Sequence, residues 1–378
     1  MTAATITKSL ETQDLLVNMG PQHPSTHGVL RLLVKTDGEL VSEVTPVIGY
    51  LHRCAEKIGE NLTYVKYVPY TDRMDYLSSM SDNLAFCLAV ERLMQLEIPE
   101  RAKYIRIIMA ELNRVASHLL ALGTYGLDVG AFTPFLYAFR EREIIMNIFE
   151  YVCGARLTYN YVKVGGVMKD VDKKFADMTF NFLNMFEAKI KDYNDLLTYN
   201  QIFITRTRGM GIIPLWLAIE YGISGPNLRA SGSSLDIRKI QPYSGYEKFQ
   251  FDVPVGTDGI GVVGDCWNRY FVRIEEMRQS CRIVRQALEA LPAGKYCGDV
   301  KRAVKPSKGE AYTSIENPRG ELGFYIISDG SETPIRVKIR APSFCNLSIL
   351  PELSKGVLIA DLIAILGSID IVLGEIDR

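Results

Sequence analysis

The pattern of hydrophobic and polar positions changes twice along the chain. Residues 15–34 form short apolar runs around a loop at 20–28, and a similar run follows the turn signal Asp37-Gly38. Near the other end, the apolar runs 322–327 and 335–339 are separated by a second turn signal. These patterns predict a small antiparallel meander near the N-terminus and a β hairpin near the C-terminus.

Between these ends, apolar residues return every three or four positions, which is the period of an amphipathic helix. We expect long helices at about residues 71–96, 102–122, 134–152, 171–197 and 265–291. A short helix at 355–366 and a strand-like segment at 369–373 should follow. Long helices with short connections are typical of a bundle, so the predicted fold class is α+β and mostly α.

The sequence contains no internal repeat and no low-complexity linker, which favours a single domain over residues 1–378. Its β-rich parts are expected at 12–47 and 320–341, with a helical part at 48–300. A C-terminal helix and a buried tail should occupy 342–378.

Composition and charge exclude several classes of protein. The 378 residues are 47% hydrophobic and 23% charged, and 43 basic residues against 44 acidic ones give a net charge of −1. We therefore expect no nucleic-acid partner. The most apolar stretch, residues 356–374, is interrupted by Asp361 and Asp370. An aspartate at the bilayer centre costs about 2.5–3.5 kcal/mol, so this stretch should not span a membrane.

The N-terminal segment, residues 1–14, has neither an apolar signal core nor an Arg-rich transit composition. The protein should stay where it is made and reach a membrane only through partners. Seven scattered cysteines form no C-x-x-C pair, and no Gly-rich dinucleotide fingerprint is present. We therefore expect reduced thiols and no redox cofactor bound by this chain.

The loop 20–28 holds two of the four histidines, His23 and His27, between two prolines and two bounding glycines. It could be a structural turn, or a binding or proton-transfer loop, because histidine exchanges a proton near its ordinary pKa of about 6.5. A metal pair is disfavoured because Pro24 opposes a helical His-x-x-x-His arrangement and no third ligand is near.

Three further features have a structural and a functional interpretation. Asp72 and Asp75 could cap the first long helix, with Tyr76 in its core. Asp128 is expected in a mostly apolar, Gly-rich loop, where it is either exposed or buried with a donor or cation. Glu111, Arg114 and His118 follow i, i+3, i+7 spacing, as a charged stripe on a helix surface would.

Several short, specific segments follow one another along the chain: 20–28, 48–58, 72–76, 111–114, 140–143, 224–229, 251–254, 338–344 and 374–378. Together they resemble the 49-kDa-type quinone-site subunit of complex I, the proton-pumping NADH–quinone oxidoreductase, over essentially the whole chain. The resemblance implies a fold like that of the nickel–iron hydrogenase large subunit.

It also implies a peripheral-arm subunit on the cytoplasmic side of the inner membrane, in a bacterium or an organelle-encoded equivalent. With an adjacent cluster-bearing small subunit, the chain would form the quinone headgroup site, where electrons from the terminal iron–sulfur cluster reduce quinone to quinol, coupled to proton translocation. FMN and NADH would bind elsewhere in the complex. Other peripheral-arm and membrane-arm subunits would be partners, and the chain would not be catalytic alone.

By the same resemblance, His27 and Tyr76 are the residues that hydrogen-bond the quinone headgroup. Asp128 is the acidic partner of His27, and His23 is a further residue of the headgroup loop.

Arg53 and His118 match positions beside the iron–sulfur cluster of the neighbouring subunit. The chain departs from the family pattern at Cys54, where glycine is usual, and at Trp267-Asn268 in place of Tyr-Asp. The first departure puts the packing around Arg53 in question.

The nickel–iron hydrogenases bind their metal through two cysteine pairs. At the corresponding positions this chain has Asp75 and Ser78, then Val372 and Glu375. These residues cannot form a thiolate nickel site, so hydrogenase activity is excluded. A ferredoxin-driven quinone oxidoreductase and a cofactor-free scaffold subunit remain as alternatives, and the sequence does not fix the electron donor or the type of quinone.

Overall fold

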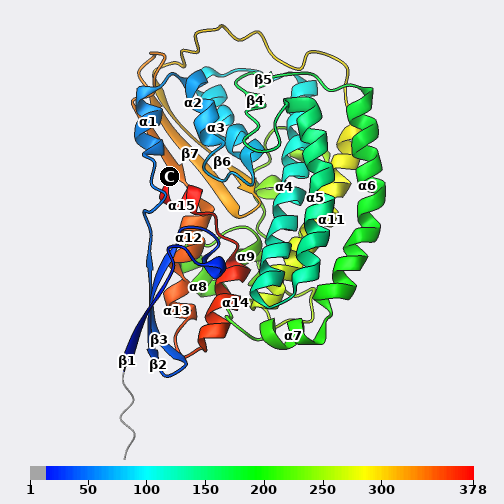
Figure 1. Ribbon diagram of the computed structural model, residues 1–378. Helices are drawn as coiled ribbons and strands as arrows, with labels where there is room; N and C mark the ends of the chain where they lie inside the picture. Colours follow the sequence, from blue (N-terminus) through cyan, green and yellow to red (C-terminus); the bar gives the residue numbers. More distant parts are fainter. Residues whose placement is uncertain (1–13) are drawn as a thin grey trace, which may run out of the picture.

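The computed structural model describes residues 14–378 and is dominated by a bundle of long helices with a small sheet on each side of the C-terminal segment (Figure 1). The bundle helices are α4 (Glu100–Asp128), α5 (Phe132–Cys153), α6 (Lys173–Tyr193) and α11 (Cys266–Glu289). Aspartates cap two of them: the carboxylates of Asp172 and Asp265 accept hydrogen bonds from the backbone N–H groups of the first turns of α6 and α11. The predicted bundle is therefore confirmed.

The predicted helix at 71–96 is wrong in its first part. The chain forms α2 (Tyr64–Thr71) and α3 (Ser79–Met94), with a turn at 72–78 between them. Polar side chains form hydrogen bonds with backbone groups of this turn. The Ser79 hydroxyl donates to the Asp72 carbonyl at 2.9 Å, and the Asp75 N–H donates to the Asp82 carboxylate at 2.8 Å. Such bonds compete with helix continuation, which the apolar period alone does not reveal.

The N-terminal meander is confirmed for the described residues. Strands β1 (Asp14–Met19), β2 (Arg31–Asp37) and β3 (Leu40–Val47) form an antiparallel sheet in that order. Residues 12–13 of the predicted β-rich segment lie outside the described chain. Alternate residues of β2 are buried, and they join the larger hydrophobic core that also fills the bundle.

The C-terminal hairpin is confirmed and has one strand more than predicted. Strand β7 (Gly320–Ser328) pairs with β8 (Arg336–Arg340) and, on its other side, with β6 (Gly309–Asn317). The β-rich part therefore begins at Gly309 and not at 320. Helix α3 packs against β6 and β7, and this contact encloses a second, smaller core.

The C-terminal segment passes between the sheets as four helices: α12 (Pro342–Ser348), α13 (Leu350–Leu353), α14 (Ile359–Ile369) and α15 (Leu373–Asp377). The predicted strand at 369–373 is wrong, because Asp370 ends α14 in a left-handed conformation (φ 57°) and the chain then enters α15. Across residues 14–378, no helix combines the length and the apolar character that crossing a membrane requires.

The remaining elements are short. They are η1 (Pro24–Thr26), α1 (Ala55–Asn61), the hairpin β4 (Val162–Lys163) and β5 (Gly166–Val167), the π-helical turn η2 (Asn194–Thr198), α7 (Gln201–Thr207), α8 (Leu215–Glu220), α9 (Pro226–Ala230), α10 (Ile237–Ile240) and η3 (Tyr246–Lys248).

Candidate functional site

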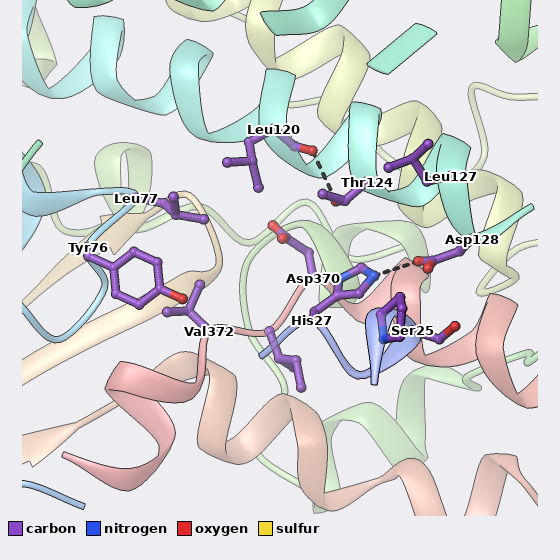
Figure 2. A pocket seen from close by; sticks show the side chains of 12 residues that line it. Ser25, His27, Tyr76, Leu77, Leu120, Thr124, Leu127, Asp128, Asp370 and Val372 are labelled. Atoms are coloured by element: carbon purple, nitrogen blue, oxygen red, sulfur yellow. Dashed lines mark hydrogen bonds and ion pairs between the residues drawn. The ribbon is translucent and has the colours of Figure 1, made fainter. Parts of the chain in front are cut away.

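Four segments that are distant in the sequence surround one cavity of ≈ 370 Å³ (Figure 2). They are the histidine loop, the turn before α3, the last turns of α4 and the residues that follow α14. Leucine, isoleucine and valine side chains form much of the wall, and the polar groups come from Ser25, His27, Tyr76, Thr124, Asp128 and Asp370. An apolar cavity with few convergent polar groups is the usual form of a small-molecule site.

The histidine loop follows a path that its sequence restricts. Gly20 has φ +89°, and a Cβ there would lie 2.1 Å from the Leu30 carbonyl oxygen, so only glycine fits. The buried Thr26 hydroxyl donates to the His23 carbonyl at 2.8 Å and fixes the η1 turn. His27 follows in a left-handed conformation (φ 52°), and its ring contacts the end of α4.

His27 and Asp128 form a short, largely buried pair. Nε2 of His27 lies 2.6 Å from Oδ2 of Asp128, and the side chains are 15% and 6% exposed. Burial lowers the pKa of His27, but the hydrogen bond to Asp128 and the charges of Asp128 and Asp370 outweigh it, so the net pKa is raised above 6.5. Burial raises the pKa of Asp128 above its ordinary value, although the hydrogen bond from His27 and the charge of His27 both lower it.

Asp128 is the last residue of α4, where the helix dipole favours a cation, which is a further reason for His27 to hold a proton. Within residues 14–378, no hydrogen bond engages the other ring nitrogen of His27, Nδ1. The imidazole can therefore offer this nitrogen to a molecule in the cavity. The expectation that a buried Asp128 would have a partner is confirmed, whereas its expected place in a loop is wrong.

Tyr76 is held by the turn between α2 and α3. Asn113 of α4 fixes this turn by donating to the Leu77 carbonyl at 3.0 Å and by accepting the Met80 N–H at 3.0 Å. The tyrosine is half-buried, and its hydroxyl points into the cavity (Figure 2) without a hydrogen-bond partner among the described residues. Burial raises the pKa of Tyr76, although the positive charges of Arg319 and Arg53 oppose this, so the phenol stays a hydrogen-bond donor.

The structure thus places His27, Tyr76 and Asp128 at one cavity, and it separates the other predicted site residues. His23 is exposed, does not line the cavity, and accepts the Ser25 N–H through Nδ1. Arg53 does not line the cavity and donates to the Gly374 carbonyl at 2.8 Å. His118 is completely buried and does not meet Arg53.

Two structural interpretations of the sequence are corrected. Asp72 is the C-cap of α2, and the N-cap position of α3 belongs to Ser78, so neither Asp72 nor Asp75 caps the start of α3. Glu111, Arg114 and His118 are buried rather than on a helix surface, because other charged residues surround α4 on that side.

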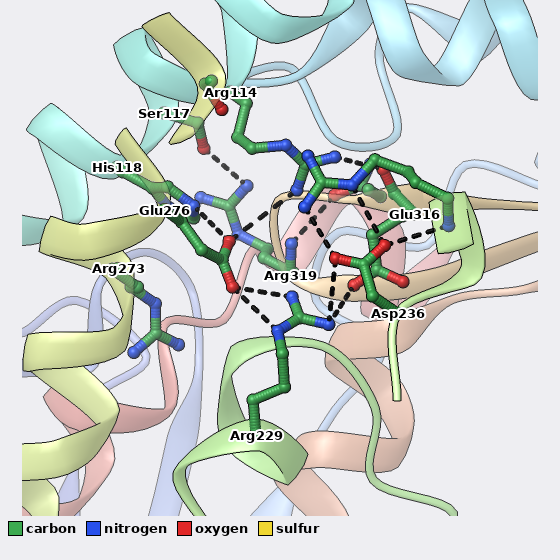
Figure 3. Close-up of polar contacts among 12 residues, drawn as sticks. Arg114, Ser117, His118, Arg229, Asp236, Arg273, Glu276, Glu316 and Arg319 are labelled. Atoms are coloured by element: carbon green, nitrogen blue, oxygen red, sulfur yellow. Dashed lines mark hydrogen bonds and ion pairs between the residues drawn. The ribbon is translucent and has the colours of Figure 1, made fainter. Parts of the chain in front are cut away.

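A buried ionic network includes His118, Arg229, Glu276 and Arg319 (Figure 3). Glu276 of α11 joins His118 at 2.9 Å and Arg229 at 2.7 Å. Arg319, from the turn between β6 and β7, joins Asp75 at 2.8 Å and Asp370 at 3.3 Å. Removal of one member of such a pair would leave a buried charge without compensation, so the network fixes the relative positions of the helices and the C-terminal segment.

Asp370 is a cavity residue that sequence reasoning did not place in the site. Its carboxylate points into the cavity, between Tyr76 and His27 in the view of Figure 2. An aspartate that interrupts the most apolar stretch of the chain was the available signal. From the sequence, this aspartate served only as an argument against a membrane span, because no pattern in the sequence shows that it lies beside Arg319 or His27.

The four positions that the sequence comparison above aligned with hydrogenase cysteines also lie near this site. Asp75, Ser78 and Glu375 are buried, and Val372 lines the cavity. Arg319 pairs with Asp75, and the Ser343 hydroxyl donates to Glu375. Among residues 14–378, no group of three or more histidine, cysteine or acidic side chains could hold a metal ion.

Cys54, the departure near Arg53, is exposed and has φ 57°. Glycine adopts this left-handed conformation without strain, which explains why glycine is usual there. The Arg53 side chain still bonds the Leu51 and Gly374 carbonyls.

The fold and the cavity together define an α+β protein that presents hydrogen-bond donors to a small molecule inside a largely apolar site. Residues 128–307 and 298–378 match the family model of the respiratory-chain NADH dehydrogenase 49 Kd subunit, and the chain belongs to this family. The resemblance stated from the sequence is therefore confirmed, and so is the fold class predicted from the pattern, α+β and mostly α.

Curated relatives agree over nearly the full length. The D subunit of the NADH-quinone oxidoreductase of Chlorobaculum tepidum is 52% identical over 378 residues, which cover 99% of this chain and 94% of the relative. The protein of the same name in Bacillus mycoides is 53% identical over 369 residues, which cover 97% of this chain and all of the relative. The chain is thus a subunit of an NADH–quinone oxidoreductase of the complex I type.

Proposed function

We propose that the cavity between the histidine loop and the end of α4 is the place where this complex reduces its quinone. The observation that carries the proposal is the convergence of the His27–Asp128 pair and the unpartnered Tyr76 hydroxyl on one apolar-walled cavity. These groups come from segments far apart in the sequence. A subunit that acted only as a scaffold would not require these groups to converge on one cavity.

Reduction of a quinone to a quinol takes two electrons and two protons, and negative charge develops on two carbonyl oxygens. Tyr76 and His27 would each donate a hydrogen bond to one of these oxygens, where the charge develops. His27 would be the readier proton source, because the ordinary pKa of tyrosine is about 10. Loss of both protons would leave negative charge beside Asp128, and rearrangement of that charge could be the signal to the proton-pumping subunits.

The electrons would come from an iron–sulfur cluster held by an adjacent subunit, since the chain itself lacks a thiolate cluster motif. FMN and NADH would bind on other subunits, and the complex would reach the membrane through its membrane-arm subunits, with this chain on the cytoplasmic side. His23 would take part only if the exposed part of the loop closed over the headgroup.

The test is a Tyr76→Phe substitution in the assembled complex. Loss of one donor to a developing oxyanion should lower quinone reduction by roughly 10²–10³-fold. Electron transfer to ferricyanide, which does not need the quinone site, should be unchanged. Tyr199→Phe is the matched control, because Tyr199 is half exposed and lies outside the cavity.

Unchanged quinone reduction in Tyr76→Phe would place the site elsewhere and leave this chain as a scaffold. Equal loss of both activities would indicate failed assembly. In that case, a photoreactive quinone analogue on the unsubstituted complex decides: labelling near Tyr76 supports the site, and labelling confined to other subunits refutes it.

A further inference from the structure

A second, much smaller cavity adjoins the first. It lies between α4, α11 and the end of α14 and measures ≈ 10 Å³, about the space that one water molecule needs. Its walls include His118, Tyr125, Arg273 and Asp370. Asp370 lines both cavities, so the small cavity adjoins the proposed quinone site at this residue.

Four of the residues that line this small cavity each have a buried polar atom with no hydrogen-bond partner among residues 14–378. These atoms are His118 Nδ1, the Tyr125 hydroxyl, Arg273 Nε and Asp370 Oδ2. Arg273 Nε and Asp370 Oδ2 form an ion pair at 3.6 Å, which is too long for a direct hydrogen bond, so each atom can still bond to a further molecule. Buried polar groups are normally hydrogen-bonded, so four of them around one cavity indicate that they share a small hydrogen-bonding ligand.

The four atoms match the bonding capacity of water. His118 Nε2 faces the Glu276 carboxylate at 2.9 Å, so Nε2 carries the proton and Nδ1 is an acceptor. Burial lowers the pKa of His118 despite the bond to Glu276, which keeps the imidazole neutral. The cavity therefore offers two acceptors, His118 Nδ1 and Asp370 Oδ2, and two donors, Arg273 Nε and the Tyr125 hydroxyl, whose other polar neighbour is the Cys266 thiol.

We propose that this cavity binds one ordered water molecule, which ties Asp370 to α4 and α11 and thereby fixes Asp370 as a second carboxylate partner of His27. The kinetic consequence rests on the proposed quinone site, whereas the water site itself does not. Asp370 acts here as a positioning residue: its charge favours the protonated imidazole that would serve the quinone.

The groups that face Asp370 come from every element packed around it. Arg273 belongs to α11, Arg319 to the turn between β6 and β7, and His27 to the histidine loop. Asp75 approaches from the turn before α3, and His118 and Tyr125 from α4. If Asp370 lost its charge or left its position, the positive charges of the two arginines would be less compensated. Protonation of His27 would then be less favourable.

The first part of the test is a substitution that fills the small cavity without altering a polar group. Ala121 of α4 lines this cavity and not the larger one, so Ala121→Val should exclude the water. Ala116→Val adds the same volume at a buried position of the same helix that lines neither cavity, and it is the control. High-resolution maps of the assembled complex should show water density beside Asp370 in the control but not in Ala121→Val.

The second part is the pH profile of quinone reduction. Asp370→Asn should move the alkaline limb to lower pH, by less than Asp128→Asn does, because the charge of Asp370 raises the pKa of His27 less than Asp128 does. Ala121→Val should shift it in the same direction by less, with the KM for quinone unchanged, and Ala116→Val should not shift it.

Maps that show no water in the small cavity would overturn the proposal, and so would an unshifted profile in Ala121→Val once its water is gone. Tyr76→Phe separates this result from failure of the quinone site. If Tyr76→Phe loses quinone reduction while Ala121→Val retains the normal profile, the site stands and the role of the water is wrong.

Discussion

Asp128→Asn is the most direct test of how the proposed site holds its proton. Asparagine has nearly the same shape as aspartate and can still accept a hydrogen bond from His27 Nε2, which lies 2.6 Å from the Asp128 carboxylate. The substitution therefore removes the charge of the pair while it preserves the contact. Its effect should appear in the protonation of His27 and only slightly in the shape of the cavity.

The magnitude follows from the type of hydrogen bond. A bond to a charged group contributes roughly 1.5–3 kcal/mol and a neutral one about 0.5–1.5 kcal/mol, so from the midpoints of these ranges the substitution costs the protonated imidazole about 1.2 kcal/mol. One pKa unit corresponds to about 1.36 kcal/mol, and the pKa of His27 should fall by about one unit. The pair is largely buried, which limits screening by solvent.

The assay is quinone reduction by the assembled complex over a range of pH, with ferricyanide reduction measured in parallel. The pKa of folded His27 is raised, so its proton is retained below the ordinary value of 6.5 and lost as the pH rises through the higher folded value. In Asp128→Asn the activity should therefore decline at lower pH than in the unsubstituted complex. An unchanged alkaline limb, with full activity, would refute the assignment of His27 as the proton donor.

Three other substitutions test the packing around the site. In Gly367→Ala the new Cβ would lie 2.3 Å from Asp128 Oδ2, so quinone reduction should fall, whereas Gly298→Ala, which meets only ordinary contacts, should leave it normal. Burial raises the pKa of Glu375 from 4.5 to about 8, so its contribution to stability is lost as the pH rises from 4.5 through 8. Compared with the unsubstituted complex, Glu375→Gln should therefore have a higher thermal inactivation midpoint at pH 8 to 9 but not near pH 4.5. If the two complexes had the same midpoint at pH 8 to 9 as well, the reasoning would be contradicted. Glu276→Gln should destabilise the chain by about 3–5 kcal/mol, seen as reduced incorporation into the complex, because it leaves buried cations without their counter-charge.

Local pattern was sufficient for the regular elements, because helices and strands leave periodic apolar positions in the sequence. The helices α4, α5, α6 and α11 and the hairpin β7–β8 were predictable in this way. The apolar pattern gave a wrong prediction where polar side chains form hydrogen bonds with backbone groups several residues away. The turn at 72–78 interrupts an apolar period that continues into α3, and strand β6 carries too many polar residues to stand out.

The sequence by itself determined the family, because short specific segments keep their order over the whole chain, and through the family it supplied His27, Tyr76 and Asp128 as the proposed site residues. Only the tertiary structure decided which of the proposed residues share a cavity, since His27, Tyr76 and Asp370 come from segments separated by up to hundreds of positions. The same holds for the burial of Glu111, Arg114 and His118. A charged residue inside a protein depends on partners that other elements supply, and no periodicity in the sequence records which element will pack beside it.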